Sequence, residues 1–196
     1  MTFLNKSEIE AMGFSSVGEN VLISNRASFY NCAQISIGSN VRVDDFCLFS
    51  AGKNGIFIGN NVHIAAYTSL IGAGRISISD FCNISSRVSI YSSSDDYSGS
   101  SMTNPTIPDD FKNVHHADVN LEKHVIVGCG SVILPGLDIK EGAAIGALSL
   151  VNDNCSAFSI YAGVPAKFIK NRNHKIKELE ILFYDQERAK KQLIIS

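Results

Sequence analysis

The stretch "LEKHVIVGCGSVILPGLDIKEGAAIGALSLV", Leu121 to Val151, repeats one pattern every six residues. Each hexad opens with an aliphatic residue, and a small or apolar residue follows four positions later; the openings are Leu121, Val127, Ile133, Ile139 and Ile145. A period of six matches neither an amphipathic helix nor an isolated strand with one buried face. It predicts a chain that changes direction at regular intervals and stacks short strands on one another.

The same hexads occur in the N-terminal half, where eight more open at Val17, Ile23, Ile37, Val43, Ile58, Ile64, Ile78 and Ile84. In twelve of the thirteen hexads the fourth residue after the opening is Ala, Ser, Thr, Val or Cys, as at Cys47 and Cys82. The N-terminal hexads group into blocks of 20 or 21 residues, each with a third apolar position at Phe29, Phe49, Leu70 or Ile90. Three short strands per block predict triangular coils, which stack into a mostly-β parallel β-helix around a column of aliphatic side chains.

Three segments lie outside the repeat. "NKSEIEAMGF" places Ser7 three residues before Glu10, the spacing of a capping box, and predicts a cap helix within residues 1–16. The repeats occupy residues 17–170, but residues 91–120 carry no hexad, which predicts a long protruding loop with a functional role. Residues 171–196 combine spaced apolar residues with a charged background and predict a C-terminal helix that packs on its own or a neighbouring subunit.

Composition narrows the class of protein. The 196 residues are 45% apolar with a net charge of −2, and Lys and Arg are not concentrated before the last thirty residues, so we expect a small-molecule partner and no nucleic acid. The N-terminus lacks a basic segment followed by an apolar one, and no eighteen apolar residues are consecutive, so we expect a cytoplasmic protein without a membrane span. Five cysteines without CxxC spacing indicate reduced, packed thiols.

The segments "ISIGSNVRVDDF" and "IFIGNNVHIAAY", together with the opening stretch, resemble the hexapeptide-repeat acyltransferases, which have a left-handed β-helix. Within that family the chain is most similar to the branch of maltose and galactoside acetyltransferases and bacterial surface-polysaccharide O-acetyltransferases. The resemblance implies a homotrimer with active sites between subunits, acetyl-CoA as acetyl donor and a sugar as acceptor.

The main functional reading is therefore acetylation of a sugar hydroxyl in surface-polysaccharide or O-antigen synthesis. One alternative is acetylation of the amine of a nucleotide-linked amino sugar. Two others are a non-catalytic trimeric scaffold and a metal lyase, because some carbonic anhydrases share the coil and bind zinc through three histidines. His63 and His124 occupy different positions in their hexads, so we expect no metal site.

In the resembling enzymes the inserted loop delivers a catalytic histidine to the neighbouring subunit, but the matching position here is Asp95, followed by Asp96. A carboxylate with an ordinary pKa of about 3.9 removes a hydroxyl proton poorly unless burial or a second carboxylate raises that pKa. His63 precedes the inward residue Ile64, so its side chain should point out of the coil. We therefore expect His63 to act as the base, with Asp95 or Asp96 of a neighbouring subunit orienting its imidazole or binding the sugar.

Four other histidines are weighed as well. His115 and His116 lie where the loop returns, and because adjacent side chains of an extended segment point opposite ways, one of them at most faces the cleft. Either remains an alternative base. His124 is expected on the surface and His174 within the terminal helix, neither with a catalytic role.

The resemblance also implies where the donor binds. The pantetheine arm of acetyl-CoA is expected on the surface of the last hexads, at Gly128, Ser131, Gly146 and Ala147, although tight turns require small residues too. "GVPAK", with Pro165 and Lys167, and then Lys170, matches the end motif in which a basic residue approaches the cofactor phosphates. Ile126 occupies a position where many relatives have Trp, which leaves the acceptor open.

Overall fold

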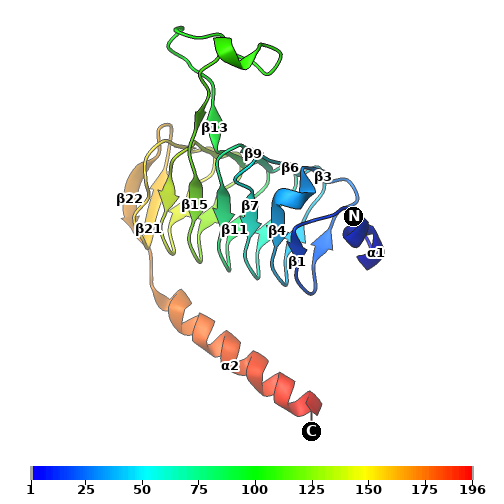
Figure 1. Ribbon diagram of the computed structural model, residues 1–196. Helices are drawn as coiled ribbons and strands as arrows, with labels where there is room; N and C mark the ends of the chain where they lie inside the picture. The colour runs from blue at the N-terminus through cyan, green and yellow to red at the C-terminus, as the bar shows by residue number, and fades with distance from the viewer. Residues whose placement is uncertain (1, 196) are drawn as a thin grey trace.

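The computed structural model describes residues 2–195, and their strands form three parallel sheets around a common axis, a solenoid of about seven turns (Figure 1). Sheet one contains β1 (Ser16–Val17), β4 (Ile35–Ile37), β7 (Ile56–Ile58), β10 (Ile76–Ile78), β15 (Val119–Leu121) and β18 (Asp138–Ile139). Sheet two contains β2 (Leu22–Ile23), β5 (Arg42–Val43), β8 (His63–Ile64), β11 (Asn83–Ile84), β16 (Ile126–Val127), β19 (Ala144–Ile145), β21 (Ser159–Ala162) and β22 (Lys167–Asn171). Sheet three contains β3 (Ser28–Tyr30), β6 (Leu48–Ala51), β9 (Ser69–Gly72), β12 (Ser89–Tyr91), β17 (Val132–Ile133) and β20 (Leu150–Val151).

The hexads set the register of these sheets, and the predicted parallel β-helix is confirmed. Each hexad opening pairs with the opening one coil later, as in Ile37 with Ile58 and Ile58 with Ile78. Beyond the first coil these openings are buried, and each fully buried Ile contributes about 1.5–3 kcal/mol. The third apolar position is stacked in the same way, with the rings of Phe29 and Phe49 edge to face at 4.9 Å.

The small inward position of the hexad explains two of the five cysteines. Cys47 and Cys82 are buried as predicted, and desolvation by burial raises the pKa of the Cys47 thiol to about 11 and that of Cys82 to about 12. Such thiols stay protonated and unreactive near neutral pH. Cys129 departs from the prediction of packed thiols, because it is exposed.

Helix α1 (Lys6–Ala11) covers the open end of the first coil and buries Ile9 there. Its capping box is formed by Asn5 and Glu8, so the predicted pair of Ser7 and Glu10 was wrong by two residues. Asn5 Oδ1 accepts the Glu8 N–H at 3.0 Å, and a Glu8 carboxylate oxygen accepts the Asn5 N–H at 2.7 Å. Asn caps as well as Ser, and the Asn-x-x-Glu spacing is equivalent.

The predicted insertion is confirmed as an excursion that leaves after β12 and returns at β15, and it projects from the solenoid (Figure 1). The stem of the insertion is a hairpin of β13 (Ser93–Ser94) and β14 (His115–His116), which the sequence analysis did not predict. Between these strands the insertion contains a short 3-10 turn, Asp109–Phe111. The stack continues across the gap, since β12 pairs with β17 and β10 with β15. The insertion therefore does not interrupt the core.

The C-terminal helix α2 (Lys175–Ile195) extends away from the last coils (Figure 1). Its first turns are held by Glu180, which accepts a hydrogen bond from Lys123 Nζ at 2.9 Å and lies 2.7 Å from His124 Nε2. His124 is only 4% exposed and stacks on Phe81 at 5.1 Å, so its predicted surface position was wrong. His174 precedes α2 and stacks on Phe158 at 4.1 Å. None of the described helices is long and apolar enough to cross a membrane.

Candidate functional site

His63 projects from β8 on the outer face of sheet two, as its place in the hexad predicts. Its side chain is 43% exposed, and its Nε2 lies 2.9 Å from Oδ2 of Asp44, which comes from the preceding coil. The other carboxylate oxygen of Asp44 accepts a hydrogen bond from Arg42 Nε at 2.7 Å. In this chain the imidazole is thus oriented by Asp44, a residue the sequence analysis missed, and by neither Asp95 nor Asp96 of the same chain.

The Asp44 carboxylate is held in its ionised form. Partial burial works in the opposite direction, but hydrogen bonds from Arg42 and His63 outweigh it and lower the pKa of Asp44. An ionised carboxylate on one imidazole nitrogen favours the tautomer with the proton on that nitrogen, which leaves Nδ1 of His63 as an acceptor. The pair has the orientation of a carboxylate-supported base.

Asp95 and Asp96 follow strand β13 at the start of the insertion. Asp95 is exposed, and both acids line a small hollow of about 150 Å³ with Tyr97 and Thr103. Asp96 is engaged by its own loop, because its Oδ1 accepts the Ser98 N–H at 2.8 Å. Hydrogen bonds, the first of them with the Ser98 side chain, lower the pKa of Asp96. Of the two acids, Asp95 is the one directed to solvent.

His115 and His116 form β14, the second strand of the hairpin stem, and both are exposed. Ser93 Oγ accepts the Ala73 N–H at 2.7 Å and lies 2.7 Å from His116 Nδ1. A serine hydroxyl has one donor and two acceptor positions, so this contact suits either tautomer of the His116 ring. The contact holds His116 to the stem of the insertion, and both histidines stay alternative bases.

Four of the predicted donor residues, Gly128, Ser131, Gly146 and Ala147, lie where the chain passes from sheet two to sheet three. We call this edge the 2–3 corner; its successive turns are residues 24–27, 44–47, 65–68, 85–88, 128–131 and 146–149. Ala147 and Cys129 are exposed there, next to Leu148, which is 72% exposed. Apart from Leu148, residues 128–131 and 146–149 have small side chains, and none of them is charged, which suits a thin, amide-rich ligand.

Two of the predicted donor residues have structural reasons for being small. A Cβ atom on Gly128 would lie 2.5 Å from the Ala147 nitrogen, and one on Gly146 would lie 2.8 Å from the Ala162 Cβ, because successive turns stack closely. Ser131 must be corrected, since it is fully buried and donates its hydroxyl to the Gly146 carbonyl at 2.9 Å. Its side chain fills the core and does not reach a ligand on the outer surface.

The end motif lies beyond the last coil. Pro165 is exposed, and Lys167 and Lys170 project from β22, which adds antiparallel to β21 at the end of sheet two. Neither lysine forms an ion pair with a carboxylate in the part of the chain that the structure describes. Both ammonium groups are therefore available for a phosphate.

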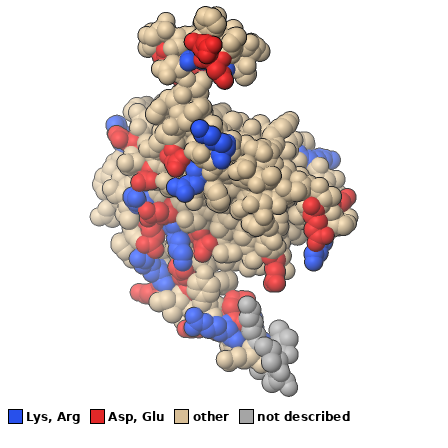
Figure 2. Space-filling view, in the orientation of Figure 1, with Lys and Arg blue, Asp and Glu red and all other residues tan. Residues whose placement is uncertain are grey.

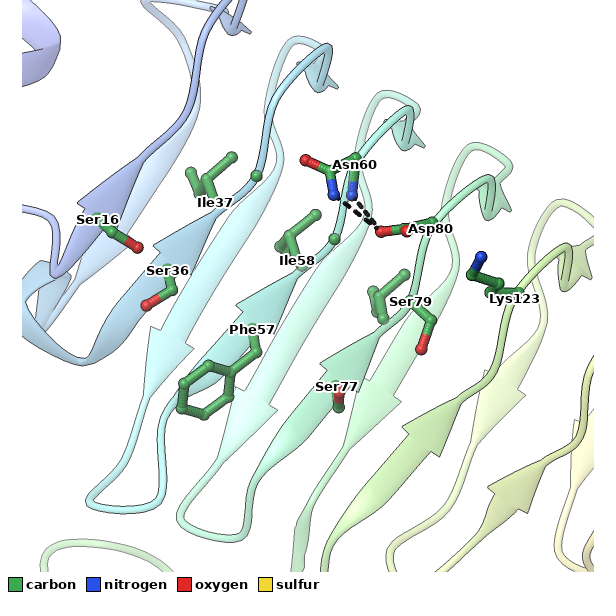
Figure 3. A pocket seen from close by; sticks show the side chains of 13 residues that line it. Ser16, Ser36, Ile37, Phe57, Ile58, Asn60, Ser77, Ser79, Asp80 and Lys123 are labelled. Atoms are coloured by element: carbon green, nitrogen blue, oxygen red, sulfur yellow. Dashed lines mark hydrogen bonds between the residues drawn. The ribbon is translucent and has the colours of Figure 1, made fainter. Parts of the chain in front are cut away.

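A shallow groove of about 460 Å³ crosses the outer face of sheet one (Figure 3). Ser16, Ser36, Phe57 and Ser77 are adjacent in the register of β1, β4, β7 and β10, and Asn60 donates to Asp80 at one edge. Figure 2 shows that the middle of this face is uncharged, whereas charged side chains lie on the projecting insertion and over the C-terminal coils. The groove contains none of the predicted site residues. Among residues 2–195 no group of three or more His, Cys, Asp or Glu side chains could hold a metal ion.

Comparison with known proteins identifies relatives over almost the whole chain, although no protein-family model matches it. It is 56% identical to the dTDP-4-amino-4,6-dideoxy-D-glucose acyltransferase of Escherichia coli over 183 residues, 93% of this chain and 95% of that protein. It is 32% identical to the putative lipopolysaccharide biosynthesis O-acetyl transferase WbbJ of Escherichia coli K12 over 145 residues, 71% of this chain and 70% of that one.

Among solved structures, an aspartate variant of AntD, an N-acyltransferase from Bacillus cereus in complex with dTDP and coenzyme A, matches with a TM-score of 0.91 and 48% identity, over 95% of this chain and all of that one. Two serine variants of AntD, with alanine or cysteine in place of the serine, are in complex with dTDP-4-amino-4,6-dideoxyglucose and coenzyme A. With this similarity and a solenoid of hexapeptide repeats, the chain belongs to the hexapeptide-repeat acyltransferases and is itself an acyltransferase.

Proposed function

We propose that this protein transfers an acyl group from a coenzyme A thioester to the amino group of a dTDP-linked 4-amino-4,6-dideoxy sugar. The observation that carries the proposal is the 56% identity, over 93% of the chain, to an enzyme named for that sugar. The relatives favour the alternative of amine acylation over the main reading of hydroxyl acetylation, which is supported by the 32% identical WbbJ.

The acids of the insertion suit an amine better than a hydroxyl. A hydroxyl needs a base to remove its proton as the new bond forms, and a carboxylate of ordinary pKa does this poorly. A neutral amine attacks without prior loss of a proton, and its N–H groups donate to a carboxylate. Asp95, where the resembling O-acetyltransferases have a histidine, fits the role of holding and orienting an amine.

We assign a serine to the same role. The serine and the aspartate replaced in the AntD variants are ten positions apart in that protein. Here Ser85 and Asp95 are ten apart, as are Ser86 and Asp96. Because Asp96 is engaged by the Ser98 N–H, we choose the first pair. Ser85 lies on the 2–3 corner and is half-buried.

The proposed reaction needs one group to take a proton. The amine nitrogen attacks the thioester carbonyl carbon, the C–S bond breaks, and the amine loses one proton while the coenzyme A sulfur leaves as a thiolate that is then protonated. His63, supported by Asp44, is the proposed proton acceptor, since Asp44 contacts its Nε2 and leaves Nδ1 to accept a proton.

Coenzyme A is proposed to lie along the C-terminal turns of the 2–3 corner, over Gly128, Gly146 and Ala147, with its phosphates near Lys167 and Lys170 beside Pro165. The AntD structures contain coenzyme A and, in one case, 3-hydroxybutyryl-CoA. The acyl group is therefore proposed as acetyl or a short hydroxyacyl chain, and acetyl-CoA is the first donor to test.

The two groups proposed to hold the amine lie on different edges of one chain. Ser85 is on the 2–3 corner, Asp95 is on the insertion, and strand β12 separates them. They can meet at one amine only if the insertion of one subunit reaches the 2–3 corner of another. This is the basis for proposing a homotrimer with intersubunit sites.

The experiment is a transfer assay with purified full-length protein, dTDP-4-amino-4,6-dideoxyglucose and either acetyl-CoA or 3-hydroxybutyryl-CoA. We expect release of coenzyme A thiol and a product whose acyl group resists hydroxylamine, as an amide does. dTDP-6-deoxyglucose, which differs only by a hydroxyl in place of the 4-amine, is the matched control. A hydroxylamine-labile product, equal transfer to dTDP-6-deoxyglucose, or no transfer from either thioester would contradict the proposal.

A further inference from the structure

Four side chains stack along the N-terminal turns of the 2–3 corner, and we call them the aromatic–arginine ladder: Arg26, Phe46, Tyr67 and Arg87. The rings of Phe46 and Tyr67 are stacked at 4.9 Å with 23° between their planes. The guanidinium of Arg26 lies 5.6 Å from the Phe46 ring centroid, and that of Arg87 lies 5.3 Å from the Tyr67 centroid. All four side chains are exposed, and none of them belongs to the buried core.

The turns of the coil place these side chains above one another. Phe46, Tyr67 and Arg87 each occupy the third position of a turn and adopt left-handed conformations, with φ of +61°, +64° and +60°. The same conformation recurs at Gly130 and Leu148 of this corner and at Phe81 and His124 between sheets one and two, so it belongs to the coil. What distinguishes the ladder is therefore the choice of side chains and not the backbone.

Charge distinguishes the two ends of the ladder. Arg26 has a carboxylate partner, because its Nη1 lies 4.0 Å from Asp45. Asp44, the other acid of that turn, is paired with Arg42 and His63. Within the described residues no carboxylate forms an ion pair with Arg87. Arg87 is thus an exposed, uncompensated cation held against a ring.

We infer that Arg87 binds the diphosphate of the acceptor nucleotide and that Tyr67 positions it; this inference rests on the proposed function. A guanidinium that lies over an aromatic ring uses its face, so its in-plane N–H donors remain free for bidentate contacts with phosphate. Arg87 is two residues from Ser85, the proposed partner of the amine. In a dTDP-4-amino sugar one pyranose ring separates the amine from the diphosphate, which matches this short separation.

The ladder also fixes the direction in which the acceptor lies. Residues 128–131 and 146–149 of the same corner are proposed for coenzyme A, so the nucleotide must extend the other way, toward the N-terminal coils. Successive coils are about 4.8 Å apart. The thymidine then lies along the exposed edges of Tyr67 and Phe46, and the reacting ends of donor and acceptor meet near Ser85.

The test is a titration of full-length protein with dTDP, thymidine and coenzyme A, comparing the wild type with Arg87→Gln and Arg26→Gln. We expect Arg87→Gln to weaken dTDP binding about 10- to 100-fold, as loss of a charged hydrogen bond does, and to bring it close to that of thymidine. Thymidine and coenzyme A binding should change less than about twofold. Arg26→Gln, a matched change at the compensated end of the ladder, should bind dTDP as the wild type does.

Two further variants separate the role of the positive charge from that of the guanidinium shape and of the ring beneath it. Arg87→Lys keeps the charge but loses the planar guanidinium that can contact phosphate through two N–H groups, so it should recover only part of the lost dTDP affinity. Tyr67→Leu removes the ring under Arg87 and should raise the KM for the sugar nucleotide several-fold while leaving the KM for acyl-CoA unchanged. Thermal melting of each variant identifies any that fails to fold.

Several results would overturn the inference. Unchanged dTDP affinity in a folded Arg87→Gln variant, or in Arg87→Lys if the glutamine variant does not fold, would exclude Arg87 as the phosphate ligand. A loss of coenzyme A binding instead of dTDP binding would place Arg87 in the donor site. If wild-type protein binds coenzyme A but not dTDP, the proposed acceptor is wrong, and that failure appears before any variant is compared.

Discussion

At the scale of single residues, the carboxylates of this protein divide by what engages them. Asp44 is held by Arg42 and His63, and Asp96 by the Ser98 N–H, whereas Asp95 faces solvent. A carboxylate that already accepts hydrogen bonds orients its neighbours, and one that does not is available to a ligand. We therefore expect substitutions of Asp44, Asp95 and Asp96 to have different effects.

Replacing Asp95 with asparagine should reduce amine acylation about a hundredfold, because the amide holds an amine less strongly than an ionised carboxylate does. Asp96→Asn is the matched control, one residue away, and should retain activity within about fivefold while slightly loosening the insertion. Steady-state kcat/KM for the sugar nucleotide measures both. The reverse ranking would transfer the role to Asp96 and its counterpart Ser86.

His63→Ala should lower kcat by roughly a hundredfold with little change in thermal stability, since the side chain is largely exposed and is the proposed general base. Asp44→Asn should lower kcat less and should shift the pH profile, because the asparagine still accepts a hydrogen bond from the imidazole but carries no charge. A His63→Ala enzyme with wild-type kcat would remove the imidazole from the mechanism and leave the amine to lose its proton to water.

At the scale of elements, the 2–3 corner is a row of turns, and a larger side chain in one turn should obstruct a ligand that binds over that turn. Ala147→Leu should raise the KM for acyl-CoA at least tenfold, with kcat at saturating donor largely preserved, because Ala147 is exposed and a larger side chain meets no core. Ser36→Leu makes the same kind of change on sheet one, away from the 2–3 corner, and should be neutral. Equal KM values in both variants would place the pantetheine arm elsewhere.

The contact between α2 and the solenoid should depend on pH. Partial burial opposes ionisation of Glu180, but hydrogen bonds from His124 and Lys123 prevail and lower its pKa below the ordinary 4.5. A carboxyl with a depressed folded-state pKa stabilises the contact above its unfolded pKa and loses that contribution as the pH falls through the folded pKa. We expect amides in the first turns of α2 to lose protection against deuterium exchange, measured relative to the intrinsic rate at the same pH, below pH 4.5 and, at neutral pH, in Glu180→Gln.

Asp185→Asn is the control for this contact, since Asp185 pairs with Arg188 within the helix. Its exchange at neutral pH should match that of the wild type. If Glu180→Gln also exchanges as the wild type does, the aromatic contacts of Phe183 and Tyr184 with Phe81 hold α2 by themselves.

Elements also differ in how far the sequence predicts them. The coils were predictable because each hexad carries its own burial pattern, and the register follows from the 20- or 21-residue blocks. The burial of His124 was not predictable, because it is covered by helix α2, whose Glu180 is 56 residues further along the chain. The Asp44–His63 pair had a signal that was missed: Arg42 and His63 are one block apart, so a residue next to Arg42 on the outer face had to lie beside His63. Asp95, at the position where the resembling enzymes have a histidine, was a second signal, pointing to an amine acceptor.

At the scale of the whole molecule, the proposed intersubunit sites can be tested by complementation. In a homotrimer that contains both Asp95→Asn and His63→Ala chains, one site of the three would combine an intact insertion with an intact His63. Mixed trimers, purified through two different tags, should therefore recover roughly a third of the wild-type rate, although each parent is inactive. Mixed trimers as inactive as their parents would place both residues in one chain's site.

The unbroken stack of coils has one more consequence. Because β12 pairs with β17 and β10 with β15 across the insertion, every turn of the 2–3 corner follows the previous one at the same interval of about 4.8 Å. With coenzyme A along this corner, as proposed, the number of coils between Ser85 and Lys170 sets the distance from the amine to the cofactor phosphates. One extra coil would lengthen that distance by about 4.8 Å, so the coil count would select the length of the thioester donor.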